Sequence, residues 1–268
     1  MTTTSPLIRL LDWYIAMGVD EAIALDPQDR LATARPVAPA PPPPIIVTRT
    51  QPSRAAAGPA LVAPSAAAAT ARELAFAAHS LTELEAAIRR FDGCALKHTA
   101  TNTVFADGDQ TAPLMVIGEA PGADEDRIGR PFVGRAGQLL DRMLATIGLD
   151  RTTTYITNVL FWRPPGNRKP TNDEIAACLP FVWRHIALKR PRVLLLAGGT
   201  SAATLLGRSE GIMRLRGRWT ALAVPDLEQA VPTLATFHPS FLLRAPARKA
   251  EAWTDLLNLK ARLEALHE

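Results

Sequence analysis

Four short apolar runs in the chain are typical of buried strands. They are PLMVIGEAPG (113–122), TYITNVLFW (154–162), RVLLLAGG (192–199) and PTLATFHP (232–239). Segments with helical spacing lie between and after them, at 134–148, 171–190, 200–207 and about 246–266. Strands that alternate with helices favour a parallel sheet covered on both faces. The sequence therefore predicts an α/β fold of three layers, αβα, around a central, mostly parallel four-stranded sheet.

The first part of the chain has a different pattern. Apolar residues at helical spacing predict one short amphipathic helix within 1–30. Over 31–70 the chain is rich in Pro, Ala, Ser and Thr, and such a segment buries too little apolar surface to offset the entropy of ordering it. We therefore expect a disordered linker there, with an ordered arm as the alternative, and a folded domain over 71–268.

Polar residues mark two predicted helix starts inside that domain. The segment 71–91 is expected to form two helical pieces, with Ser80 or Thr82 as the N-cap of the second. Thr171 is followed three residues later by Glu174, which is the spacing of a capping box.

Composition narrows the class of protein. The 268 residues carry 30 Lys and Arg against 26 Asp and Glu, a net charge of +4, which is a mild basic bias compatible with a polyanionic partner. Two cysteines cannot form a disulfide framework, so a reducing compartment is expected. The N-terminus lacks the pattern of a signal peptide, and no apolar run reaches the length of a membrane span. We expect a soluble, cytoplasmic, monomeric protein without membrane contact.

Glycine and polar residues follow each predicted strand. The first run ends in Gly118-Glu119-Ala120-Pro121-Gly122, the second reaches Asn158, the third ends in Gly198-Gly199-Thr200 and the fourth in His238-Pro239-Ser240. Ligands of open α/β sheets bind beyond the carboxyl ends of the strands. These residues are therefore expected to meet in one crevice.

The motifs GEAPGADED, GRPFVGRAGQLLDRML, YITNV, RPPGNRKPTNDEIAAC and HPSFLLR occur in this order between about 90 and 257. Together they resemble the uracil-DNA glycosylase superfamily, and most closely its family 4. The resemblance implies a base-excision repair hydrolase that binds uracil-containing DNA and cuts the N-glycosidic bond of flipped-out deoxyuridine, leaving free uracil and an abasic site. Because no lysine lies in a motif in a way that suggests a Schiff base, we expect no strand cleavage.

The resemblance also implies residue roles. His238 would donate a hydrogen bond to uracil O2, while Glu119 and Asn167 would help to place the attacking water. Asn158 can accept from uracil N3–H and donate to O4, a pattern that cytosine reverses. The other expected uracil contacts are Phe132, which would stack on the base, Glu125, which would block the methyl group of thymine, and Gly118 and Ala120, which would let the main chain approach.

Base flipping calls for an apolar wedge and for phosphate contacts. Leu242 and Leu243 are the expected wedge. The expected DNA contacts are Arg163, Arg168, Lys169, Thr200, Ser240 and Arg244. Each role has a structural alternative: a satisfied histidine for His238, a turn cap for Asn158, core packing for Phe132, Leu242 and Leu243, and a solvated surface for Glu125 and the basic residues.

Family 4 is expected to hold a [4Fe-4S] cluster on four cysteines. Here Cys94 and Cys178 match two of those positions, whereas Lys97 and Trp162 replace the others. Since such clusters need thiolate ligands, we predict no metal and no cofactor, with Trp162 packed into the space of the cluster.

Two other functions fit part of the pattern. One is a uracil-DNA binding or sensing protein with weak or single turnover, although the chain lacks the His-bearing basic insert that the resemblance would associate with such a branch. The other is a small-molecule nucleotide-binding protein, which the fold alone would allow. A free nucleotide needs neither a wedge nor surrounding arginines.

Overall fold

The structure is a computed structural model and describes residues 66–266. The helix expected within 1–30 and the linker expected over 31–70 lie outside these residues, except for 66–70, which are helical. Helix α2 (Ala66–Ala77) begins five residues before the boundary predicted at 71. None of the described helices is long and apolar enough to cross a membrane.

A six-stranded sheet forms the centre, in the order β1-β3-β2-β4-β6-β5. Its strands are β1 (Ala106–Gly108), β2 (Leu114–Gly118), β3 (Thr154–Asn158), β4 (Val193–Ala197), β5 (Trp219–Leu222) and β6 (Val231–Thr236). The four predicted strands are β2, β3, β4 and β6, which pair in parallel. The α/β fold is confirmed, but the sheet has two further strands, β1 and β5, which pair antiparallel at its two edges.

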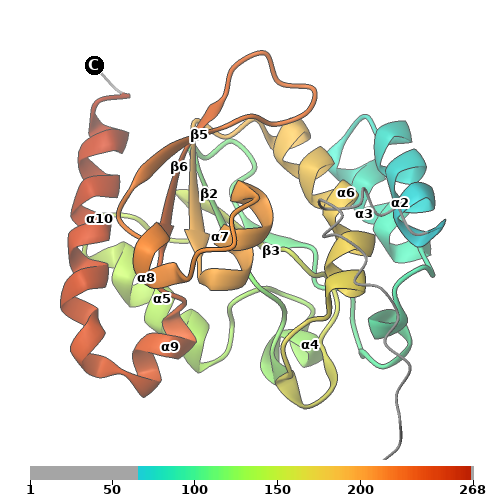
Figure 1. Cartoon of the computed structure of the whole chain (residues 1–268), viewed down its shortest axis with the longest axis horizontal. Coiled ribbons are helices and arrows are strands. Elements are labelled where there is room, and N and C mark those ends of the chain that lie inside the picture. The colour runs from blue at the N-terminus through green and yellow to red at the C-terminus, as the bar shows by residue number, and fades with distance from the viewer. Residues whose placement is uncertain (1–65, 267–268) are drawn as a thin grey trace, which may run out of the picture. The chain divides into compact units, whose positions relative to one another are not determined.

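Helices cover both faces of this sheet, with α5 and α10 on one side and α2, α3 and α6 on the other (Figure 1). The remaining described helices are α3 (Leu81–Arg90), α4 (Ala123–Ile128), α5 (Arg135–Ala145), α6 (Asn172–Lys189), α7 (Gly199–Leu206), α8 (Ile212–Leu215), α9 (Pro239–Arg244) and α10 (Lys249–Glu264). Short 3-10 helices lie at Ala95–His98, Pro165–Asn167 and Pro246–Arg248.

Alternate residues of the central strands pack into two apolar clusters. In β2, Met115 and Ile117 face the cluster under α2, α3, α6 and α7, whereas Leu114 and Val116 face the cluster under α5, α9 and α10. Side chains of a strand alternate between its two faces, so a strand covered on both sides has to be apolar throughout. This is why the strands read as continuous apolar runs.

Polar side chains cap the starts of α3 and α6, as the sequence predicts. Ser80 accepts a hydrogen bond from the Glu83 amide at the start of α3. Thr171 and Glu174 form the reciprocal capping box of α6. These caps satisfy amide groups that have no partner within the helix.

Candidate active site

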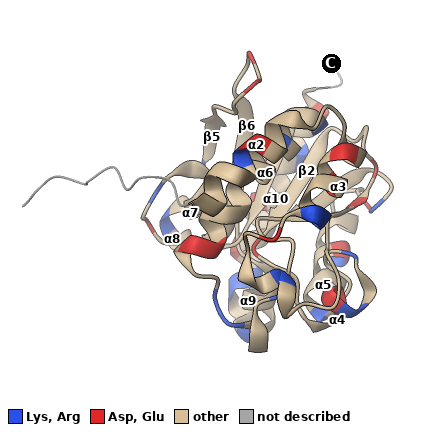
Figure 2. Cartoon of the chain, turned by 90° about the vertical axis from the view of Figure 1, so that its right-hand side faces the viewer, with Lys and Arg blue, Asp and Glu red and all other residues tan. Residues whose placement is uncertain are grey.

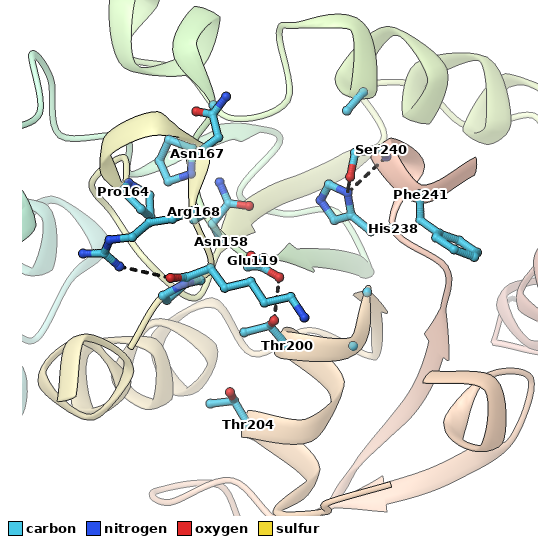
Figure 3. Close-up of a pocket in the computed structure, with 18 of the residues that line it drawn as sticks. Glu119, Asn158, Pro164, Asn167, Arg168, Thr200, Thr204, His238, Ser240 and Phe241 are labelled. Carbon is cyan, nitrogen blue, oxygen red and sulfur yellow. Dashed lines mark hydrogen bonds between the residues drawn. The ribbon is translucent and has the colours of Figure 1, made fainter. Parts of the chain in front are cut away.

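An open cleft of about 1400 Å³ lies where the loops that follow the four parallel strands meet. Predicted site residues that line it are Glu119, Ala120, Glu125, Phe132, Asn158, Asn167, Arg168, Lys169, Thr200, His238, Ser240 and Arg244. Glu119, Asn158, Thr200 and His238 reach it from the ends of four different strands (Figure 3). Parallel strands present their carboxyl ends at one edge, which explains the convergence. Gly118, Arg163, Leu242 and Leu243 are not part of the lining.

His238 follows β6 and is the N-cap of α9. Its Nδ1 accepts a hydrogen bond from the backbone N–H of Ser240 at 3.1 Å, and the Ser240 hydroxyl lies 2.8 Å from the same atom (Figure 3). Burial, with a smaller contribution from the Arg244 charge, lowers the pKa of His238 from 6.5 to about 4. The ring is therefore neutral at pH 7, and because Nδ1 accepts, its proton is on Nε2.

Asn158 ends β3 and is 2% exposed. Its Oδ1 is buried and has no hydrogen-bond partner among the described residues. A Cβ on Gly118, the paired residue of β2, would lie 2.4 Å from that oxygen, so this approach needs glycine. A buried acceptor without a partner costs free energy unless a ligand satisfies it. The atom thus marks a place for a donor such as an imide N–H.

Phe132 lies against Gly118 and His238. Its ring centroid is 5.6 Å from that of His238, and a Cβ on Gly118 would lie 2.5 Å from its ring. The ring is 4% exposed and belongs to the apolar cluster under α5, so it is both a core residue and part of the cleft floor.

Glu119 and Thr200 form a pair across the cleft. The Thr200 hydroxyl donates to Glu119 Oε2 at 2.5 Å (Figure 3). Thr200 lies in the first turn of α7, directly after β4. One carboxylate oxygen is thereby held, and no described group bonds the other. Such a fixed carboxylate can orient a water molecule.

Glu125 is buried, and it is therefore not the solvated surface carboxylate that was the alternative for this residue. It is 8% exposed, its Oε2 accepts from the Gly122 amide at 3.0 Å, and its Oε1 accepts from the amides of Val133 and Gly134 at 2.9 and 2.8 Å. Three backbone donors therefore use both oxygens, and Glu125 ties the start of α4 to the start of α5. It still lines the cleft.

The proline-rich loop after β3 is braced by its own side chains. Arg163 donates to Asn167 Oδ1 at 2.8 Å, and Arg168 forms an ion pair with Glu174 at 2.6 Å. Asn167 has a φ of 55° and faces the cleft with Lys169. Arg163 and Arg168 thus help to shape the loop, while Lys169 forms no ion pair with a described residue.

The structure contradicts the wedge expected at Leu242. This side chain is 1% exposed and packs in the apolar cluster under α5 and α10. Leu243 packs against the same cluster. Both lie in α9, where helical spacing directs them toward the core. Phe241, the residue before them, also packs against this cluster, and it lines the cleft as well.

Sequence reasoning missed further lining residues. Arg135 at the start of α5, Asn172, Thr204 and Phe241 have no strand-end signal because they come from helices. Lys and Arg lie on the chain around α9, and both signs of charge lie on α4 and α5 (Figure 2). Arg135 and Arg244 form no ion pair with a described residue and can contact phosphates.

The four positions that the resemblance associates with cluster ligands lie near α6. Cys94 and Cys178 are 2% and 0% exposed, and Trp162, 1% exposed, packs in the same apolar cluster and donates its indole N–H to Thr103 Oγ1 at 3.1 Å. Lys97 pairs with Asp92 at 2.6 Å. Within residues 66–266, no group of three or more His, Cys, Asp or Glu could hold a metal ion. Two thiols do not fit the usual four-thiolate set of a [4Fe-4S] cluster.

Comparison with known proteins gave consistent matches. A sequence model of the uracil DNA glycosylase superfamily matches residues 105–258. A type-4 uracil-DNA glycosylase of Pyrobaculum aerophilum is 38% identical over 180 residues, which cover 66% of this chain and 91% of that protein. The type-4 enzyme of Archaeoglobus fulgidus is 38% identical over 180 residues, covering 66% and 89%. That of Thermotoga maritima is 38% identical over 158 residues, covering 59% and 80%.

These relatives correct the prediction that the chain has no cofactor. They are type-4 enzymes, and type 4 is the family for which a [4Fe-4S] cluster is expected. The predicted absence of a cofactor was wrong, because it rested on only two substituted positions, Lys97 and Trp162. Kinship with type-4 enzymes thus stands against the predicted absence of a cofactor, although Lys97 and Trp162 replace two of the expected thiolates.

Proposed function

The chain belongs to family 4 of the uracil-DNA glycosylase superfamily, and from that premise we propose how its cleft removes uracil from DNA. The enzyme is a hydrolase of N-glycosyl bonds that acts in DNA repair. In our proposal a deoxyuridine turns out of the duplex into the cleft, and hydrolysis releases free uracil. An abasic site remains in an intact strand.

The hydrogen bond from the Ser240 amide to His238 Nδ1 is the observation that carries this mechanism. As the glycosidic bond breaks, positive charge grows on the sugar and negative charge on the base. A neutral N–H at Nε2 can donate to uracil O2 as that oxygen becomes anionic, and fixed donors of this kind stabilise a transition state most when water is excluded. The bond from the Ser240 amide to Nδ1 supports this direction of donation.

Asn158 is proposed to select uracil. Its unpartnered Oδ1 would accept from uracil N3–H, and its Nδ2 would donate to O4. Cytosine has an acceptor at N3 and a donor at C4, so both contacts would become unfavourable. Phe132 would stack on the base beside this edge.

Glu119 is proposed to orient the attacking water through its unbonded oxygen, while Thr200 holds the other. Asn167, at the opposite wall, is proposed to assist through its amide nitrogen because its Oδ1 accepts from Arg163. The basic residues Arg135, Lys169 and Arg244 would hold the phosphates next to the flipped nucleotide. Phe241 would contact the strand beside the gap.

A uracil-containing oligonucleotide tests this function. We expect the strand to stay intact after incubation and to break at the uracil position only after alkali, because no lysine lies in the site motifs in a way that suggests a Schiff base. His238→Ala and Asn158→Ala should each lower the single-turnover rate at least about a hundredfold. Strand breakage without alkali would refute the monofunctional reaction. Wild-type release that stops after one turnover would favour a sensing protein.

A further inference from the structure

Phe132 has a backbone conformation that aromatic residues seldom adopt. Its φ is 55°, in the left-handed region. Such a conformation persists only where the surrounding structure imposes it, and it often occurs at functional sites. The groups that impose it on Phe132 are therefore part of what places its ring beside Asn158 and His238.

Arg151 binds the backbone carbonyl groups of Pro131 and Phe132. It comes from the turn before β3, and its guanidinium donates to the carbonyl oxygens of Pro131, at 3.1 Å, and of Phe132. Two carboxylates hold the guanidinium in place, Asp107 at 2.6 Å and Asp141 at 2.9 Å. All three guanidinium nitrogens are thus engaged, and such a planar fork of donors fixes direction better than a single ammonium.

Glu125 accepts hydrogen bonds from the backbone amides of the next two residues, Val133 and Gly134. A third constraint is steric, since a Cβ on Gly137 would lie 1.7 Å from the Phe132 carbonyl oxygen. The carbonyls at 131 and 132 are therefore bound by a cation, and the amides at 133 and 134 are bound by an anion. Gly137 of helix α5 packs closely against the Phe132 carbonyl. All three constraints act on the backbone next to Phe132.

We infer that Arg151 is a positioning residue that sets the base-stacking ring of Phe132. This rests on the stacking role proposed above. Arg151 does not line the cleft, so it touches neither base nor phosphate. Without it, Phe132 relaxes toward negative φ and its ring leaves the floor beside Gly118. Misplaced contacts slow the chemical step of bound DNA and leave the phosphate contacts that set affinity intact.

Arg130 provides a matched control. It forms an ion pair with the same Asp107 at 2.9 Å but donates to neither carbonyl. Arg130→Ala therefore removes a charge from the same cluster without releasing Phe132. We would measure single-turnover uracil release, DNA affinity and thermal unfolding for Arg151→Ala and Arg130→Ala, each in the wild-type chain and with Phe132→Ala.

The expected result is a slower rate that depends on the ring. Arg151→Ala should slow release by about tenfold to a hundredfold with DNA affinity within about twofold, and Arg130→Ala should stay within about twofold of wild type. With Phe132→Ala present, Arg151→Ala should cause no further loss, because a residue that acts through the ring has nothing left to position.

Three results would overturn the inference. They are an equal loss in both backgrounds, an equal loss from Arg130→Ala, and a wild-type rate for Arg151→Ala. If Phe132→Ala alone keeps the wild-type rate, the stacking role fails first and the inference falls with it. Should Arg151→Ala not fold, Arg151→Lys keeps a cation beside Asp107 and Asp141 without the paired donors. It should fold and lose most of the rate, and a wild-type rate would count against Arg151.

Discussion

At the scale of the residue, the chemistry depends on which nitrogen of His238 carries the proton. A histidine in water titrates near pH 6.5, whereas burial and Arg244 lower the pKa of His238 to about 4. The Ser240 amide then selects Nδ1 as the acceptor. A capping contact of α9 thereby prepares a neutral donor.

The first consequence is a rate that does not follow an ordinary histidine titration. Because the lowered pKa keeps His238 neutral down to about pH 4, its donor state is the same from pH 5 to pH 8. We expect ¹⁵N spectra of the imidazole to show the Nε2–H tautomer at pH 7 and a titration midpoint near 4. An inflection near pH 6.5 for this ring would contradict the assignment.

Arg244→Gln serves as the companion measurement. Removing this charge relieves the second cause of the lowered pKa, so the midpoint should move upward but stay below 6.5, since burial is the larger cause. A downward move would show that the electrostatic argument has the wrong sign.

At the scale of the element, α9 has two faces with separate tasks. Leu242 packs into the core and Phe241 lines the cleft, although they are neighbours in sequence. Adjacent residues of a helix point in directions about 100° apart. One short helix can therefore contribute to stability and to DNA contact through different side chains.

Substitutions should separate the two faces. Leu242→Ala is expected to lower the free energy of unfolding by about 2–5 kcal/mol, because it leaves a cavity in the core. Phe241→Ala should slow release from double-stranded more than from single-stranded DNA, since only the duplex requires flipping. Chemical denaturation and parallel assays on the two substrates measure this. Equal slowing on both substrates would exclude Phe241 from flipping.

The two edge strands were not predicted from the local sequence pattern. The edge strands β1 and β5 have three and four residues, and β1 pairs with β3, which lies about 50 residues later, at Ala106 and Thr157. A strand this short has no distinctive local signal, because its hydrogen bonds are supplied by its neighbour.

At the scale of the whole molecule, electrostatics should govern how DNA is captured. Arg135, Lys169 and Arg244 come from three separate segments and line one cleft. Each phosphate contact releases counterions, so the logarithm of the affinity should fall linearly with the logarithm of the salt concentration. Replacing one of the three by Gln should weaken binding at low salt and reduce the slope by about 1.

Arg72→Gln is the matched control for this series. Arg72 is an exposed residue of α2 that does not line the cleft, so its loss changes the net charge equally. Its salt slope should equal that of the wild type. An equal reduction would mean that net charge, and not the cleft, sets affinity.

The sequence by itself determined the four parallel strands, the helices between them and the convergence of Asn158, Glu119, Thr200 and His238. It could do so because strand periodicity is local and because parallel strands always present their ends at one edge. Its motifs also led to the family.

Only the tertiary structure decided which side chains of those segments face the cleft. Leu242 is buried in the core, Glu125 binds three backbone amides, and Arg151 reaches Phe132 from a turn with no motif of its own. These outcomes depend on packing and on hydrogen bonds between distant segments, which no local pattern encodes. The sequence names the residue types of the site, and the fold assigns them their directions.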